Sequence, residues 1–154
     1  MKKLIPLFIV LIFVLLAALF ALNIWKSEKK KSNNLMQNGV VFTGKILNLN
    51  ASNNHAFGVI KLKIKETNSQ NFINSNIIYP YQIKDSIAEV YHIITYNIHK
   101  GMIVKVDSNK QKVFFFDSDS LIYSSDLTII TDDMDKNFVL NNSQINRKYS
   151  NASD

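Results

Sequence analysis

Apolar residues are arranged in two different ways along the chain, and the change falls near residue 26. Between Leu4 and Trp25 there is no charged residue, and Asn23 is the one strongly polar position. A helix of this length spans about 33 Å, close to the hydrocarbon thickness of a bilayer. The segment has no polar face, unlike the helices that pack on soluble domains. We predict an N-terminal transmembrane helix and anchor within residues 1–25.

A cleaved signal peptide is the competing interpretation of this run. The run is longer than the 7–15 apolar residues typical of a signal peptide. Its end, from Ala17 to Leu22, offers no clean pair of small residues for cleavage. We therefore favour an uncleaved single-pass anchor.

Membrane-flanking residues stand on both sides of the run, and they are Lys2, Lys3, Trp25, Lys26, Lys29, Lys30 and Lys31. Trp suits the bilayer interface, and lysines suit the headgroups and anionic lipids. Residues 26–37 are thus a basic juxtamembrane linker. The lysine count alone places the following domain in the cytoplasm. The short Met-Lys-Lys start is instead typical of exported bacterial proteins, so we predict a cell inner membrane location with an extracytoplasmic domain.

From residue 38 onward the pattern has a period of two, which predicts strands. Lysines alternate with apolar residues from Val59 to Lys65, and this strand should form a hairpin with residues 40–49. Gly44 and Gly58 inside these strands indicate a bulge or a close approach of two backbones. Residues 102–106 and 113–116 should form a second hairpin. Residues 77–83 are a short edge segment limited by Pro80, and residues 121–131 supply one or two further strands.

Residues 85–101 are ambiguous between helix and strand. Ser86 and Glu89 fit a capping box, apolar residues follow at helical spacing, and Gly101 stands where a helix would stop. The many isoleucines and valines favour a strand. We predict a helix here. Residues 132–154 are polar without sustained periodicity, and we predict a largely disordered tail.

The resulting fold class is mainly β with one helix in a domain of residues 38–131: a small bent sheet, or a partly open barrel of the OB-like or SH3-like kind. The segments Gly44–Ile46, Ala56–Ile60 and Lys100–Lys105 within residues 40–116 resemble a pattern in uncharacterised bacterial small membrane-anchored β-domain proteins. Met102 replaces the acidic residue that such proteins often carry after Lys-Gly. The resemblance implies no activity.

Charge and composition narrow the function classes. The net charge is +6, but six of the 18 basic residues flank the apolar run against one acidic residue, Glu28. The remainder is close to neutral, so we expect no nucleic acid partner. The chain has no cysteine, which excludes disulfides, thiolate metal sites and a cysteine nucleophile. The lack of thiols suits either side of a membrane.

No recognisable catalytic set or metal site emerges. His92 and His99 would lie two turns apart on a helix, too far to share a metal, and the pair Glu89 and His92 is at most half a site. The acidic run from Asp132 resembles a calcium loop but has Phe138 and Gln144 at the positions that require Gly and Glu. We predict no catalytic residues, no metal and no cofactor.

Two functions remain. The first is a non-enzymatic binding or scaffolding module that binds another envelope protein by β-augmentation at exposed strand edges, such as that near Pro80. The second is a small-molecule or glycan binder. Its stacking surface would be formed by Tyr79, Tyr81, Tyr91 and Tyr96, and the Phe114–Phe116 triplet is a further stacking candidate for which core packing is favoured. In either case the bilayer is a partner.

Overall fold

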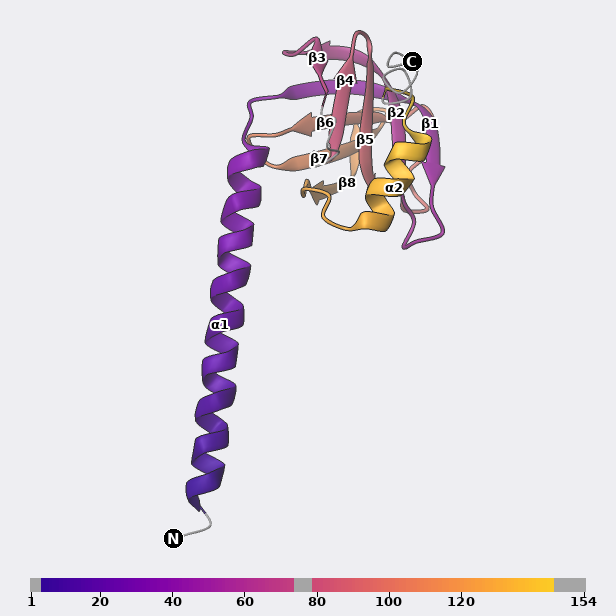
Figure 1. The fold of residues 1–154 in the computed structure, drawn as a ribbon. Coiled ribbons are helices and arrows are strands. Elements are labelled where there is room, and N and C mark those ends of the chain that lie inside the picture. Colours follow the sequence, from indigo (N-terminus) through magenta and orange to yellow (C-terminus); the bar gives the residue numbers. More distant parts are fainter. Residues whose placement is uncertain (1–3, 74–78, 146–154) are drawn as a thin grey trace, which may run out of the picture. The chain divides into compact units, whose positions relative to one another are not determined.

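The computed structural model describes residues 4–73 and 79–145, apart from the side chains of residues 4–11, 25, 28, 29, 31 and 32 (Figure 1). The chain forms two compact units, Met1–Leu35 and Met36–Asp154. The second unit holds one open antiparallel sheet of eight strands, so the predicted mainly β class is confirmed.

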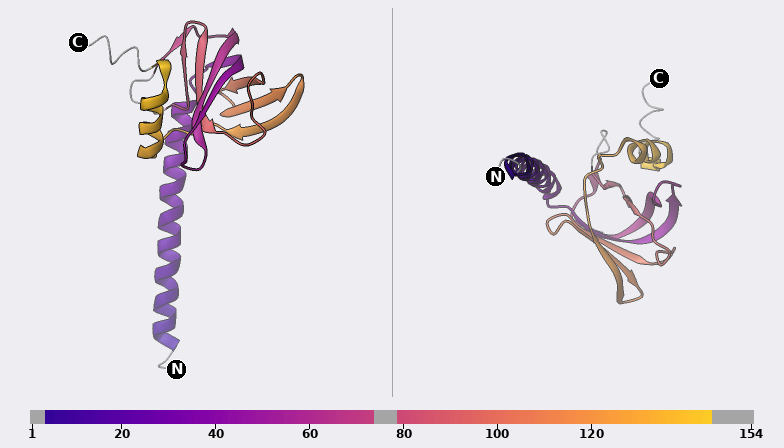
Figure 2. Two further views of the ribbon diagram at one scale, coloured as in Figure 1. Left: turned by 90° about the vertical axis from the view of Figure 1, so that its right-hand side faces the viewer. Right: turned by 90° about the horizontal axis from the view of Figure 1, so that it is seen from below.

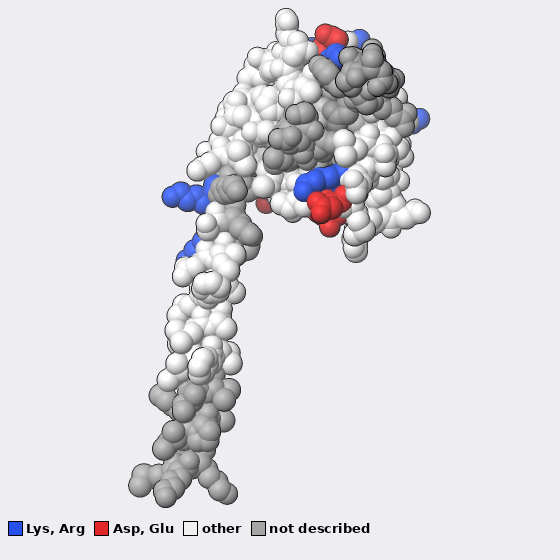
Figure 3. Space-filling view, viewed as in Figure 1, with Lys and Arg blue, Asp and Glu red and all other residues white. Residues whose placement is uncertain are grey.

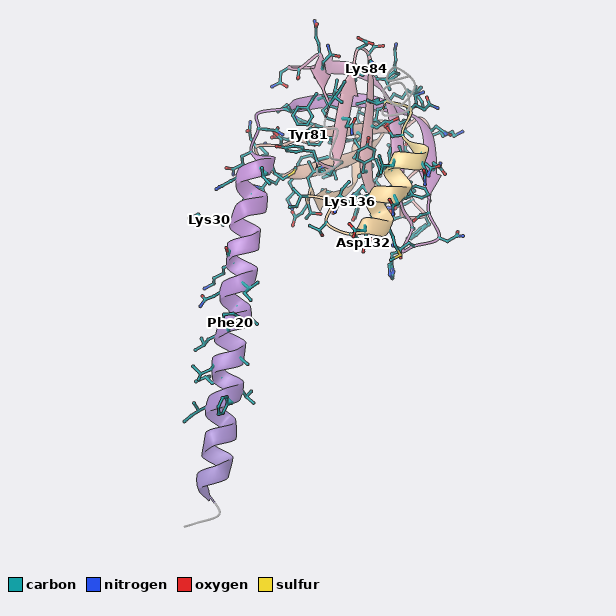
Figure 4. The ribbon with its side chains drawn as sticks, in the orientation of Figure 1. Phe20, Lys30, Tyr81, Lys84, Asp132 and Lys136 are labelled. Carbon is teal, nitrogen blue, oxygen red and sulfur yellow. The ribbon has the colours of Figure 1, made fainter. Side chains whose placement is uncertain are left out.

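The described part of the first unit belongs to helix α1 (Leu4–Met36), whose last residue is the first of the second unit. The helix runs through the predicted basic linker, because residues 26–36 contain good helix formers and neither Gly nor Pro. Figure 4 labels Phe20 and Lys30, which are both exposed. Lys2 and Lys3 lie outside the described residues. Among the residues that were described, none belongs to a helix both long and apolar enough to cross a membrane.

The second unit is built almost entirely from hairpins. Its strands are β1 (Val41–Ala51), β2 (Phe57–Thr67), β3 (Asn71–Phe72), β4 (Tyr81–Lys84), β5 (Ile87–Ile93), β6 (Ile103–Asp107), β7 (Lys112–Asp117) and β8 (Ser120–Asp126). They lie side by side in the order β3-β4-β5-β2-β1-β6-β7-β8. Two connections join strands that are not neighbours in the sheet: β4 and β5 lie between β2 and β3, and β2 and β1 lie between β5 and β6. Short turns join β1 to β2, β4 to β5, β6 to β7 and β7 to β8.

Both predicted hairpins are confirmed. β1 pairs with β2, and β6 pairs with β7. A register shift falls between Thr43 and Gly44, which is the predicted bulge. A Cβ atom at Gly58 would lie 2.4 Å from the Asn50 carbonyl oxygen and 2.5 Å from Ile94 Cδ1. Only glycine therefore lets β2 lie this close to the end of β1.

The predicted helix over residues 85–101 is wrong: strand β5, Ile87–Ile93, occupies its first half. β5 is paired on both sides, with β4 and with β2, and both of its faces are covered. Ala88 and Val90 fill one face while Glu89 and Tyr91 are buried on the other. A strand buried on both faces loses the alternation that identifies it. The supposed capping residue Glu89 instead makes buried tertiary hydrogen bonds.

The C-terminal predictions also need correction. The second of the two possible strands in residues 121–131 does not form, and residues 127–132 carry the chain to a helix, α2 (Asp133–Asn142). The expected disordered tail is thus ordered at least to Ile145. The Asp132 carboxylate caps α2 by accepting from the Met134 and Asp135 amides, and Val139 is fully buried. Residues 146–154 lie outside the described residues.

The sheet is strongly bent (Figure 2). The rings of His92 on β5 and Phe115 on β7 are 6.1 Å apart, although three strands separate β5 from β7 in the sheet. A flat sheet would place them roughly 19 Å apart at about 4.8 Å per strand. The main core fills the inner side of this bend, and it includes Met36, which is the last residue of α1 and the first residue of the second unit. α2 covers the other face of β2 and β5, where Val59, Tyr91, Ile130 and Val139 form a second cluster.

Candidate functional site

The four predicted stacking tyrosines do not gather on one surface. Tyr81 is fully buried, and its hydroxyl donates to Asn38 Oδ1 at 2.7 Å. Burial raises its pKa to about 12. Tyr79 is half-buried and its ring lies 6.4 Å from the Tyr81 ring, so these two are brought together, along with Phe72. Tyr91 is buried beneath α2 on the opposite face, and Tyr96 is fully exposed.

The Phe114–Phe116 triplet is split by the alternation of β7. Phe115 is fully buried in the main core. Phe114 and Phe116 point to the other face and are half-buried. The triplet is therefore divided between core and outer surface, as strand geometry requires.

Glu89 and His92 lie three apart on a strand, so they occupy opposite faces and do not form a joint site. His99 is exposed, with Nε2 3.7 Å from Asp117. Across residues 4–73 and 79–145, no group of three His, Cys, Asp or Glu side chains is arranged to hold a metal ion. The Asp132 run forms a helix cap and first turn.

Glu89 is the buried polar centre that the sequence did not reveal. It is 1% exposed and accepts hydrogen bonds from the Tyr91 hydroxyl (3.0 Å), the Ser143 hydroxyl (2.5 Å) and the Gln144 amide (2.8 Å). Lys61, its neighbour across the strand pair, donates to the Gln144 side chain. Burial and the Glu89 charge raise the pKa of Tyr91 well above its usual value. The carboxylate thus ties the end of α2 to the sheet. A charged residue inside the apolar run 87–94 was the available signal.

A cavity of about 550 Å³ opens between the bent sheet and the start of α2. We call it the His92 cavity. It is lined by the turn at 54–55, the neighbouring ends of β2 and β5, the end of β8 (Ser125 and Asp126), and residues between Thr128 and Asp135. This volume is in the range of small-molecule sites. Asp132 stands at this end of α2 in Figure 4.

The polar groups of the His92 cavity are unusual. The Nε2 atom of His92 is buried and has no hydrogen-bond partner among the described residues. Burial lowers the pKa of His92, so the imidazole is neutral near pH 7. Partial burial raises the pKa of Asp135 and the nearby Asp132 charge adds to this, whereas the hydrogen bond from Asn54 and the nearby His55 lower it.

β8 forms one border of the sheet and is a second candidate surface. It pairs with β7 alone, and no other strand in the part of the chain that the structure describes pairs with its outer edge. Leu121 and Ile122 are 54% and 46% exposed. By contrast, the predicted edge at Pro80 is not open: Pro80, Tyr81 and Gln82 are buried.

Comparisons of the whole chain with known protein families, with curated proteins and with solved structures found no match in any of the three.

Proposed function

We propose that this protein is a single-pass, membrane-anchored binding module of a bacterial cell envelope, non-enzymatic, which takes up an extended segment of another protein along β8. The observation that carries the proposal is the open edge of β8. A strand edge presents unpaired backbone N–H and C=O groups, and an extended peptide can satisfy them by β-augmentation.

β8 lacks the features that usually protect an edge. Edges are commonly blunted by short length, proline or lysine. The opposite border, β3, has two residues, whereas β8 has seven and contains neither proline nor lysine. Its one charged residue, Asp126, is ion-paired with Lys112 at 2.5 Å. An added strand would extend the rows formed by Phe116 with Leu121 and by Phe115 with Tyr123.

The anchor and its location rest on the sequence. The uncharged run Leu4–Trp25, flanked by lysines, has the length of a bilayer span. The bent sheet is compatible with the expected partly open OB-like or SH3-like barrel. Because the chain has no cysteine, Ser150→Cys introduces a single thiol. Labelling by an impermeant maleimide in osmotically opened cells supports an extracytoplasmic domain, and labelling only after lysis places it in the cytoplasm.

Affinity capture tests the binding surface. The intact protein is captured in mild detergent as wild type, as the double variant Leu121→Lys/Ile122→Lys, and as the control Leu47→Lys/Leu140→Lys, whose leucines are similarly exposed at 44% and 49%. We expect a partner that is retained by the control and lost with the β8 variant. A partner that both variants retain equally would contradict the β8 assignment.

The alternative function, small-molecule or glycan binding, loses the tyrosine surface on which it was based, because Tyr81 and Tyr91 are buried. The His92 cavity is the place in the described structure that favours it.

A further inference from the structure

The sheet has an outer face, turned away from the main core, which α2 covers only in part. α2 packs over β2 and β5, on Val59 and Tyr91. Over β1, β6, β7 and the second half of β2, the same face is formed by the residues that alternate with the core positions. We call this area the lysine face and define it by Lys45, Lys63, Ile103, Lys105, Phe114 and Phe116.

The strand register brings these side chains together from four strands. Lys63 on β2 lies directly opposite Lys45 on β1. Beyond Lys45 the same row continues with Ile103 on β6 and Phe116 on β7. Lys105 stands in the neighbouring row, two residues along β6 from Ile103. Since neighbouring strands are about 4.8 Å apart, positive charges lie side by side at one end of the face and apolar groups lie at the other.

The lysines of this face have no acidic counterpart in the part of the chain that the structure describes. Lys45, Lys63 and Lys105 are exposed, and none of them takes part in the four ion pairs formed by the described residues. Lys63 donates a hydrogen bond to the Ser86 hydroxyl at 3.0 Å, which is a neutral partner. Basic and acidic side chains that do lie in contact elsewhere on the β domain are visible in Figure 3.

The opposed pair of Lys45 and Lys63 is unfavourable for the fold itself, because like charges directly opposite each other on antiparallel strands repel. Glu66, further along β2, lies opposite Thr43 and does not relieve this repulsion by an ion pair. Anionic groups bound at the two ammonium groups would convert the repulsion into charge-assisted hydrogen bonds. The arrangement therefore favours an anionic partner.

We propose that the lysine face binds an acidic segment of another protein, with two carboxylates at Lys45 and Lys63 and an apolar side chain against Ile103 and Phe116. In an extended peptide, alternate residues face the same side and stand about 6.8 Å apart. Two acidic residues and one apolar residue at successive alternate positions thus span about 14 Å, which matches the three strand spacings from Lys63 to Phe116.

Other partners fit the lysine face less well. A neutral ligand leaves the opposed lysines without a counterion. A nucleic acid requires a large positive field, and the chain outside the lysine-flanked apolar run is close to neutral. The lysine face binds through side chains on strands that are paired on both sides, so the inference goes beyond the proposed function at the β8 edge. Peptide titration tests the former and crosslinking from β8 tests the latter, so either can fail alone.

The test is a titration of the full chain, in mild detergent, with the fluorescently labelled peptide Ser-Glu-Ser-Glu-Ser-Leu-Ser and with the same peptide carrying glutamine for glutamate. Binding is followed by fluorescence anisotropy. We expect the glutamate peptide to bind at least about tenfold more tightly, the combined effect of two modest ion pairs. The difference should shrink as the salt concentration rises, because exposed charges are screened.

The double variant Lys45→Glu/Lys63→Glu should reverse this preference and bind Ser-Lys-Ser-Lys-Ser-Leu-Ser about tenfold more tightly than the glutamate peptide. It keeps a like-charged pair at the same positions, so the cross-strand repulsion is unchanged. The matched control is Lys26→Glu/Lys30→Glu, two exposed lysines of α1, which alters the net charge by the same amount. It should change the affinity for the glutamate peptide by less than about twofold.

The single variant Lys45→Glu separates binding from stability. It places opposite charges across β1 and β2, so Tm should not fall, whereas binding of the glutamate peptide should weaken at least about threefold. Equal binding of the glutamate and glutamine peptides, or equal effects of the two double variants, would overturn the proposal. So would tighter binding of tetragalacturonate or of a thymidine heptanucleotide than of the glutamate peptide, since either result would assign the face to a glycan or a nucleic acid.

Discussion

Replacing Glu89 by glutamine changes one buried oxygen into an NH₂ group and little else. The carboxylate accepts three hydrogen bonds, from Tyr91, Ser143 and Gln144. The glutamine oxygen can still accept from the Gln144 amide, and its NH₂ group can donate to the Tyr91 and Ser143 hydroxyls, because a hydroxyl accepts as well as donates. The three hydrogen bonds to a charged group are then replaced by weaker bonds to a neutral one.

Hydrogen bonds to charged groups contribute roughly 1.5–3 kcal/mol each, whereas neutral ones contribute about 0.5–1.5 kcal/mol. We expect Glu89→Gln to lower the free energy of unfolding by about 2–4 kcal/mol. For a β domain of about 110 residues this corresponds to a fall in Tm of roughly 9–17 °C. The assay is thermal unfolding of the full chain in mild detergent, followed by near-ultraviolet circular dichroism of the buried tyrosines.

Glu66→Gln is the control, because Glu66 is exposed on β2. It should change stability by less than about 0.5 kcal/mol. Hydrogen exchange adds a local readout: the amides of α2 should exchange faster in Glu89→Gln, since the end of this helix is released from the sheet. Equal melting temperatures for the two variants would refute the role assigned to the Glu89 carboxylate.

Three further predictions concern other parts of the domain. Gly58→Ala should lower stability by about 1–3 kcal/mol, because its Cβ would lie 2.4 Å from the Asn50 carbonyl oxygen; an unchanged melt would contradict the close approach. Burial lowers the pKa of His92 below 6.5, so at low pH the folded state binds fewer protons than the unfolded state. The free energy of unfolding should therefore fall as the pH drops below about 6.5, by at most about 1.4 kcal/mol per pH unit. The difference in Tm between pH 7.5 and pH 5 should be smaller in His92→Phe than in wild type. Equal differences would argue against His92 as the source of the pH dependence. Burial raises the pKa of Tyr81 from 10.0 to about 12, so the neutral phenol stabilises the folded state fully below pH 10, and this stabilisation is lost between pH 10 and 12. Over that interval the free energy of unfolding, measured with a denaturant, should fall less in Tyr81→Phe than in wild type. An equal fall in both would argue against this role of Tyr81.

Strands with one solvent-exposed face and one buried face were predictable from the sequence. β2 alternates lysine with Leu62 and Ile64, and β6 and β7 are joined by a recognisable turn, so both hairpins followed from local pattern. β5 was not predictable in the same way, because its burial on both faces depends on β4 on one side, β2 on the other and α2 above. The helical spacing of its isoleucines and valines was accidental.

The candidate site was hidden for a related reason. The His92 cavity joins residues from the turn at 54–55, from β5 and from the start of α2, which are far apart in the sequence. Asp132 and its capping of α2 were visible in principle, since Asp precedes a short helix that carries Val139. The helix itself is ten residues long with few apolar positions, too short for a periodicity argument. The Glu89 network could be suspected only as a charge inside an apolar run.

The central claim, that β8 is the binding edge, is tested most directly by site-specific photocrosslinking in intact cells. A photoreactive benzoylphenylalanine replaces Ile122 on β8 or, as control, Leu47 on β1, a strand paired on both sides; the two positions are 46% and 44% exposed. We predict a discrete crosslinked protein from position 122 that is absent from position 47. The same crosslinked products from both positions, or none from position 122, would contradict the account.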